Sequence, residues 1–168
     1  MARSKVITAS VQGGEALQRH LNHIALQLGS GAGVRVGFLA DATYPADAAK
    51  KGAPLHVAQV AFWDEFGTSR APMRPFIRNM IASKSPRWGY ALGQQLRATD
   101  YDSEAALARM GEGIKDQMVK SIVDFKDPPN AAYTIAKKGF NKPLIDTGVM
   151  QRSVDYQVVT GTDGGDDA

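Results

Sequence analysis

The feature that most constrains this chain is a regular series of apolar residues between positions 107 and 125. They recur at steps of three and four residues: Leu107, Met110, Ile114, Met118, Ile122 and Phe125. That spacing places all six on one face of a long amphipathic helix. Asp102 or Ser103 is a suitable N-cap, and the Asp-Pro-Pro-Asn string at residues 127–130 ends the helix because proline cannot continue it.

Shorter patterns predict the remaining elements. A first helix over residues 14–28 has its apolar residues at a 4-3-4 spacing: Leu17, Leu21, Ile24 and Leu28. A strand is predicted over 34–39. A helix starting near 55 should end at Gly67, because this glycine can adopt a left-handed cap. Helical spacing resumes at Phe76 and continues through Trp88, Leu92 and Leu96, with an interruption at Pro86. A last strand is predicted over 153–160.

These elements predict an α+β fold: a small antiparallel sheet packed with three or four helices. Residues 126–143 form a long basic loop before the C-terminal strand, with lysines at 126, 137, 138 and 142. No linker or internal repeat divides the chain, so a single domain is expected over residues 1–160. Residues 161–168 are an acidic, glycine-rich tail that we expect to be disordered.

Composition excludes several kinds of site. The 168 residues include no cysteine, which excludes disulfides and thiolate chemistry. No apolar run approaches the roughly 20 residues of a membrane span, and no membrane partner is expected. The net charge is +3, and because the tail carries three aspartates, residues 1–160 carry +6. A charge of +6 is compatible with proximity to DNA but indicates no dense basic patch, so a DNA-contacting module is only an alternative function.

Two further patterns favour structural interpretations over binding sites. Glycines at 29, 31 and 33 follow a predicted helix and precede a strand, the reverse of the order in a phosphate-binding loop. His20 and His23 are three residues apart on the first helix, with Glu15 as the only nearby carboxylate, and His56 stands alone. We therefore predict no metal site and no cofactor.

The string at residues 144–148 allows two interpretations. It reads Leu144, Ile145, Asp146, Thr147 and Gly148. Aspartic proteases carry Asp-Thr-Gly after a hydrophobic strand, and two such aspartates share a proton to activate water. That enzyme would need a flap and more strands than the 20 residues after position 148 allow.

The favoured interpretation of this string is a helix N-cap. The aspartate would accept backbone N–H bonds from the next turn, so Asp146→Asn should be tolerated and Asp146→Ala should cost roughly 1 kcal/mol. We therefore expect no enzymatic activity, with a protease using Asp146 as the distant alternative.

Three strings in order carry a family resemblance. They are Ala-Phe-Trp-Asp-Glu-Phe-Gly-Thr at 61–68, Pro-Met-Arg-Pro-Phe-Ile-Arg at 72–78, and Pro-Leu-Ile-Asp-Thr-Gly-Val-Met-Gln-Arg-Ser at 143–153. This arrangement resembles the tail-completion (neck) proteins of tailed bacteriophages, typified by gene-10-like minor tail proteins and Mu-like virion-morphogenesis proteins. The resemblance spans residues 12–160, with Met150 where leucine is commoner.

The resemblance implies a structural virion component at the head–tail junction, assembled in the host cytoplasm. Its implied partners are copies of itself in a ring, with hexameric symmetry expected. Adjacent neck or connector proteins, tail tube or terminator proteins, and genomic DNA in the lumen are further implied partners.

Interface residues are predicted around the two prolines at 72 and 75, because a stiffened loop loses less entropy on docking and arginine is favoured at interfaces. The candidates here are Arg70, Arg74, Phe76 and Arg78. Lys137 and Lys138 are further candidates in the 126–143 loop, which we expect to order on assembly and to face either a neighbouring subunit or the DNA-bearing lumen. An alternative is that the prolines only redirect the chain and Phe66 and Phe76 are core. The structural motif residues are Glu65, Phe66, Gly67, Thr68, Asp146, Thr147 and Gly148.

Overall fold

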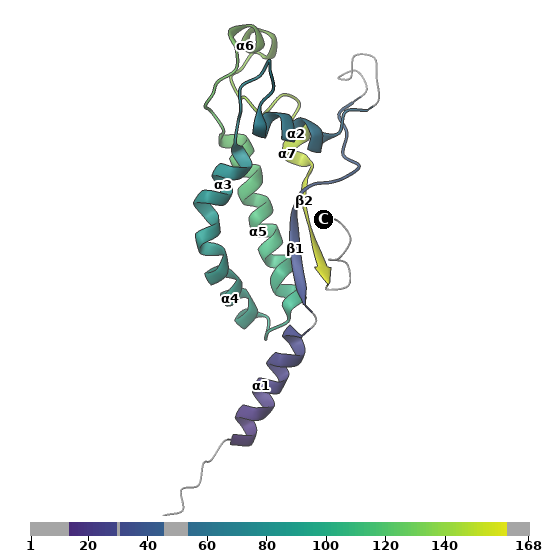
Figure 1. The fold of residues 1–168 in the computed structure, drawn as a ribbon, viewed down its shortest axis with the longest axis vertical. Helices are drawn as coiled ribbons and strands as arrows, with labels where there is room; N and C mark the ends of the chain where they lie inside the picture. The colour runs from purple at the N-terminus through teal and green to yellow at the C-terminus, as the bar shows by residue number, and fades with distance from the viewer. Residues whose placement is uncertain (1–13, 30, 46–53, 161–168) are drawn as a thin grey trace, which may run out of the picture.

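The computed structural model describes residues 14–29, 31–45 and 54–160. Its elements, in order, are α1 (Gly14–Leu28), β1 (Ala32–Phe38), α2 (Val57–Phe66), α3 (Phe76–Lys84), the 3₁₀ turn η1 (Ser85–Arg87), α4 (Trp88–Ala98), α5 (Ser103–Asp124), α6 (Ala132–Lys138), α7 (Val149–Arg152) and β2 (Val154–Thr160). The molecule is elongated, with α1 at one end and α6 at the other (Figure 1). The predicted acidic tail at 161–168 lies outside the described residues.

The sheet joins the two ends of the ordered chain. Strands β1 and β2 pair antiparallel, with Ala32 opposite Thr160 and Phe38 opposite Val154. A two-stranded sheet is marginal by itself in water and needs a packed face. Helix α5 supplies that support, lying along both strands. These observations confirm the predicted α+β fold.

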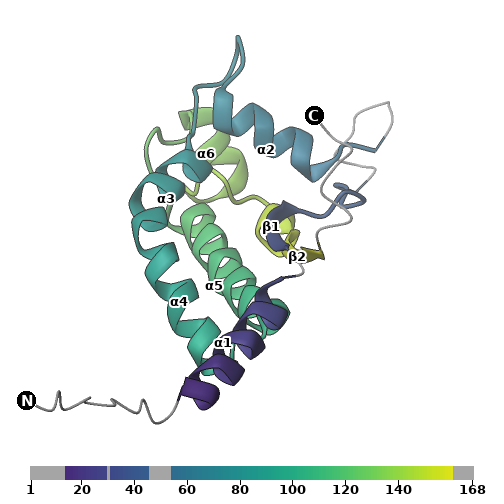
Figure 2. The ribbon, with the colours of Figure 1, turned by 60° about the horizontal axis from the view of Figure 1, so that its bottom comes forward.

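The long helix α5 organises the rest of the molecule, as its apolar spacing predicts. The Asp102 side chain caps it by accepting a hydrogen bond from the Ala105 backbone N–H at 3.0 Å. Helices α3 and α4 pack on α5 on the side away from β2, and η1 separates them at Pro86 (Figures 1 and 2). The predicted interruption at this proline is therefore a single 3₁₀ turn.

The buried core lies where α2, α3, α5, α7 and β2 meet. Its members are Val57, Ala61, Phe76, Met80, Met118, Ile122, Leu144, Met150 and Val154. The core is therefore built from both halves of the chain.

Three local expectations need correction. Residues 126–143 are not all loop, because α6 forms within them and closes at Gly139 with an αL cap. Asp146 does not cap α7: the N-cap residue is Gly148, and no side chain caps this helix. The structure therefore gives no reason for the loss of stability predicted for Asp146→Ala, because that prediction assumed that the Asp146 side chain caps the helix. Gly67 follows α2 with φ 75° and ψ 173°, so its φ is positive but the backbone is extended rather than αL.

Candidate functional site at the α2–α3 connection

A buried carboxylate ties α2 to the start of α3. Helix α3 has Pro75 at its N-cap, which offers no side-chain acceptor. Glu65 on α2, which is only 3% exposed, supplies the missing acceptor. Its carboxylate accepts hydrogen bonds from the Ile77 N–H at 2.9 Å and the Arg78 N–H at 3.1 Å. A negative charge is favoured at this position because the first N–H groups of a helix have no intrahelical partner.

Arg78 completes the same network. Its Nε donates to the Glu65 carboxylate at 2.8 Å, and its Nη2 donates to the Glu65 backbone carbonyl at 2.9 Å. Charge-assisted bonds of this kind are shorter and stronger than neutral ones. The Glu65 and Arg78 positions of the two sequence strings are thus partners in one rigid unit, although 13 residues separate them.

A second ion pair holds the connecting loop. The Arg74 Nη1 donates to the Asp64 carboxylate at 3.0 Å, and the Arg74 backbone N–H donates to the Asp64 carbonyl at 2.6 Å. Arg74 Nη2 also reaches the Asn130 side-chain oxygen at 3.3 Å. Arg74 therefore links the loop both to α2 and to the segment after α5.

The turn between these pairs leaves no room for a side chain at position 67. A Cβ on Gly67 would lie 2.9 Å from the Met73 backbone nitrogen. The Thr68 hydroxyl accepts hydrogen bonds from the backbone N–H groups of Arg70 and Ala71 at 3.2 and 3.0 Å. The Gly-Thr pair of the motif therefore shapes the turn.

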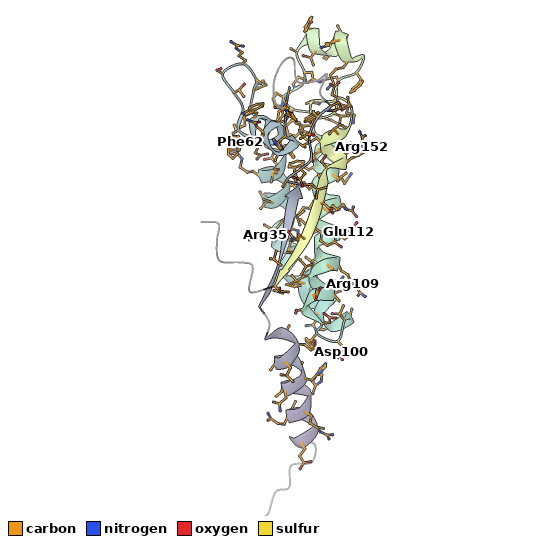
Figure 3. The ribbon with its side chains drawn as sticks, turned by 90° about the vertical axis from the view of Figure 1, so that its right-hand side faces the viewer. Arg35, Phe62, Asp100, Arg109, Glu112 and Arg152 are labelled. Carbon is orange, nitrogen blue, oxygen red and sulfur yellow. The ribbon has the colours of Figure 1, made fainter. Side chains whose placement is uncertain are left out.

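Beside the buried Glu65, α2 also exposes aromatic side chains to solvent. Phe62 is 60% exposed, Phe66 is 53% exposed, and their rings lie 4.7 Å apart. Trp63 and Met73 are also exposed. The Arg78 guanidinium lies 4.9 Å from the centre of the Phe66 ring and so joins the patch to the buried network. Figure 3 shows Phe62 at the surface of the molecule near the 67–75 loop. We call Phe62, Trp63, Phe66 and Met73 the α2 patch.

The predicted interface residues have different surroundings. Phe76 is fully buried in the core, so its assignment to an interface is wrong for this conformation. Arg74 is largely buried in its pair with Asp64. Arg70 and Lys137 are exposed, Arg78 is half-exposed, and Lys138 is partly buried. Their contacts with another molecule remain a prediction.

The patch residues Phe62, Trp63 and Met73 were missed by sequence reasoning, and Phe66 was taken as a motif or core residue. A signal was available: apolar residues surround the whole circumference of the 57–66 helix instead of forming one stripe. A helix of this kind is either buried on all sides or has a partner.

The Asp146 segment lines a separate cavity of about 250 Å³. Tyr44, Asp64 and Lys138 line it as well. Burial raises the pKa of Tyr44 to about 12, with the nearby charges of Asp64 and Asp146 adding to the effect. Burial lowers the pKa of Lys138, and Asp146 opposes that shift.

The chemistry of this cavity differs from that of a proton-sharing pair of aspartates. Asp64 is held by Arg74 at 3.0 Å; burial raises the pKa of its carboxyl and Arg74 acts to lower it. Lys138 donates to the Lys142 carbonyl at 3.0 Å and lies near Phe140. Asp64 thus lies beside Arg74, and Asp146 lies near Lys138, so each carboxyl group has a cationic neighbour.

Broader comparisons add no assignment. Within the described residues, no group of three or more histidine, aspartate or glutamate side chains is arranged to hold a metal ion. None of the described helices combines the length and apolar character that crossing a membrane requires. No family model, curated protein or solved structure matches the chain.

Proposed function

We propose that this chain is a structural subunit of a tailed-bacteriophage neck, needed to join the completed tail to the DNA-filled head. The observation that carries the proposal is the exposed α2 patch, which is built on the first two strings that resemble the tail-completion family. A contiguous apolar patch on a soluble protein is typical of a protein–protein contact.

The geometry around the patch suits an assembly contact. Glu65 and Asp64 fix the α2–α3 connection through Arg78 and Arg74, so the patch is presented on a stiff support. A preorganised surface loses less entropy on binding than a mobile one. Aromatic residues, methionine and arginine are also the residue types enriched in interface centres. The α2 patch with Arg78 has that composition.

The proposed assembly is a ring of copies of this chain, expected to have hexameric symmetry, between connector and tail proteins. A ring needs two different complementary surfaces on each subunit, because its contacts run head to tail. The described residues expose apolar side chains on α2 and also on α1, at the opposite end of the molecule (Figure 1). Two separate apolar surfaces allow one subunit to contact more than one neighbour. The subunit would assemble in the host cytoplasm and remain in the virion.

The test is electron microscopy of lysates from a phage lacking this gene, with plasmid complementation as the control. We expect DNA-filled heads to accumulate beside unattached tails, and the plasmid to restore infectious particles. Normal infectious particles without the gene would overturn the neck assignment.

A further inference from the structure

Helix α1 exposes its apolar stripe. Leu17, Leu21 and Leu28 are all exposed, at 59%, 50% and 42%, and Ile24 is partly buried on the same face. A helix of 15 residues is near the lower limit of stability in water unless its apolar face packs on something. Within the described part of the chain, nothing covers this stripe fully. It therefore needs an apolar surface elsewhere.

Two polar contacts hold α1 from a different side of the helix. His23 Nε2 lies 3.1 Å from the Asp100 carboxylate, and the Ser103 hydroxyl donates to the Gln27 carbonyl at 3.1 Å. These contacts attach α1 to the turn between α4 and α5, where Figure 3 labels Asp100. On a helical projection, His23 and Gln27 lie roughly a quarter to a third of a turn away from the leucine stripe. The anchor thus holds α1 while leaving its leucines open.

The body of the same molecule has an apolar groove without an occupant among the described residues. It has a volume of about 280 Å³ and lies between β1 and α3, over α5. Its lining includes Val34, Val36 and Phe38 from β1, Ile77 and Ile81 from α3, and Ile114 from α5, and no charged residue contributes. Ile81, one of the lining residues, is 42% exposed and so is accessible to a second molecule. A groove of this size takes inserted side chains while the helix lies above them.

The helix and the groove match in character and length. The leucine stripe from Leu17 to Leu28 extends about 18 Å along the helix, and the part of β1 that lines the groove, Val34 to Phe38, extends about 16 Å. Leucines on one helical face are the usual anchors when an amphipathic helix binds an apolar groove. The stripe is flanked by Gln18, His20, Ala25 and Gln27, and no aspartate, glutamate, lysine or arginine borders it.

We propose that α1 of one copy docks its leucine stripe into the β1–α3 groove of a second copy. Because the donor helix and the acceptor groove are different surfaces, each copy donates and accepts once, which builds a head-to-tail series that a ring closes. The anchor on Asp100 and Ser103 directs α1 away from its own groove and selects another molecule. Such docking does not require the neck assignment, so the two proposals can fail separately.

The absence of native cysteine permits a direct test by cross-linking of the full chain. One protein carries Leu21→Cys and a size tag, and the other carries Ile81→Cys. Leu21 is central in the stripe, so it comes close to the middle of the groove whichever way the helix runs. After mixing and mild oxidation, we expect a reducible disulfide between the two different proteins, since a disulfide forms only where the two Cα atoms come close together.

The matched control is Leu26→Cys mixed with Ile81→Cys. Leu26 lies on the opposite face of α1 and is 81% exposed. A cysteine there can react in random encounters between molecules, but the proposed docking does not bring it into the groove. We expect several-fold less cross-linking with Leu26→Cys than with Leu21→Cys. All three positions are exposed, and far-UV circular dichroism would verify that each variant is folded.

The other outcomes each overturn the proposal. Equal yields from Leu21→Cys and Leu26→Cys, or no cross-link from either, would mean that the stripe does not occupy the groove. Predominant dimers of the Leu21→Cys protein with itself would mean that two α1 helices pair. A double Leu21→Cys, Ile81→Cys protein that forms only an internal disulfide would mean that α1 folds back on its own body. None of these results bears on whether particles lacking the gene join heads to tails.

Discussion

At the residue scale, Glu65 shows how one buried side chain explains a sequence string. It lies on α2, yet its carboxylate satisfies the first N–H groups of α3 and pairs with Arg78. Glu65 of the first string and Arg78 of the second therefore form one bonded pair, and each needs the other to satisfy its hydrogen bonds. The strings form one structural unit, and the exposed α2 patch that they carry is free to contact other molecules.

Glu65→Ala should destabilise the protein by about 3 kcal/mol, because two backbone donors and a guanidinium lose their acceptor in a buried site. Glu65→Gln retains one acceptor oxygen and should cost about half as much. Urea unfolding followed by circular dichroism measures both. Glu104→Ala, on the exposed first turn of α5, is the control and should cost less than about 1 kcal/mol. Equal losses for Glu65→Ala and Glu104→Ala would contradict the role of the buried carboxylate.

Sequence reasoning succeeded where a residue acts through its local chain. The Asp102 cap, the break at Pro86 and the end of α2 before Gly67 were all predictable from neighbouring residues. It failed where tertiary packing decides whether a side chain is buried or exposed. Phe66 and Phe76 are the same residue type ten positions apart, and only packing makes one exposed and the other core.

At the element scale, α5 can approach the sheet because position 111 has no side chain. A Cβ on Gly111 would lie 2.8 Å from Val34 Cγ2 and closer still to the Tyr156 ring. Gly111→Ala should therefore destabilise the protein by about 1–3 kcal/mol through overpacking.

Gly113 is two residues further along the same helix, and a Cβ there meets nothing within 4 Å. Gly113→Ala should stabilise α5 by up to about 1 kcal/mol, since alanine is the better helix former. Thermal unfolding should thus shift in opposite directions for the two substitutions. A shift in the same direction would show that helix propensity, not the contact between α5 and the sheet, dominates at Gly111.

Asp155 on β2, which pairs with Lys115 of α5, should make the stability of the protein depend on pH. The backbone N–H of Tyr156 chiefly, and Lys115 secondarily, lower the pKa of Asp155. A carboxyl whose pKa is lower in the folded protein contributes stability above its unfolded pKa of about 3.9. That contribution is lost as the pH falls through the folded-state pKa. The gap in urea midpoint between the wild type and Asp155→Asn should therefore shrink as the pH falls below about 4.

Lys115→Gln separates the two causes of this pH dependence. It removes the 3.3 Å pair with Asp155 but leaves the backbone donor of Tyr156 in place. Most of the pH dependence assigned to Asp155 should consequently remain in this variant. A midpoint gap between the wild type and Asp155→Asn that stays constant from neutral to acid pH would refute the assignment.

Element prediction failed at α6 and was incomplete at α1. Residues 132–138 have too weak an apolar pattern to predict a helix, although Gly139 closes it with an αL cap. For α1, periodicity correctly placed Leu17, Leu21, Ile24 and Leu28 on one face. Periodicity identifies which side chains share a face, but what covers that face depends on the rest of the molecule or on another one.

At the scale of the whole molecule, the exposed apolar surfaces lie toward both ends of an elongated body (Figure 1). The leucine stripe is on α1 at one end, and the α2 patch lies toward the end that carries α6. In an isolated monomer these surfaces would only promote aggregation. In an ordered assembly each can be covered by a neighbour, which is why the proposed role depends on surface residues rather than on the core.

The α2 patch gives the sharpest test of that role, because its residues can be changed without disturbing the core. Phe62→Ser combined with Phe66→Ser removes two exposed rings that contact each other, and leaves the bonds of Arg78 to Glu65 in place. We expect the thermal unfolding midpoint to remain close to that of the wild type. We also expect a plasmid carrying the variant to restore no more infectious particles than an empty plasmid in a phage lacking the gene, since aromatic anchors dominate interface energies.

Tyr90→Ser is the matched control for this test. Tyr90 is an aromatic residue on α4 that is even more exposed than Phe62, but it lies outside the α2 patch. Its variant should restore infectious particles fully, which would separate loss of a specific contact from loss of any surface ring. Full restoration by the Phe62, Phe66 double variant would place the assembly contact elsewhere, and the proposed function would then lose the observation that carries it.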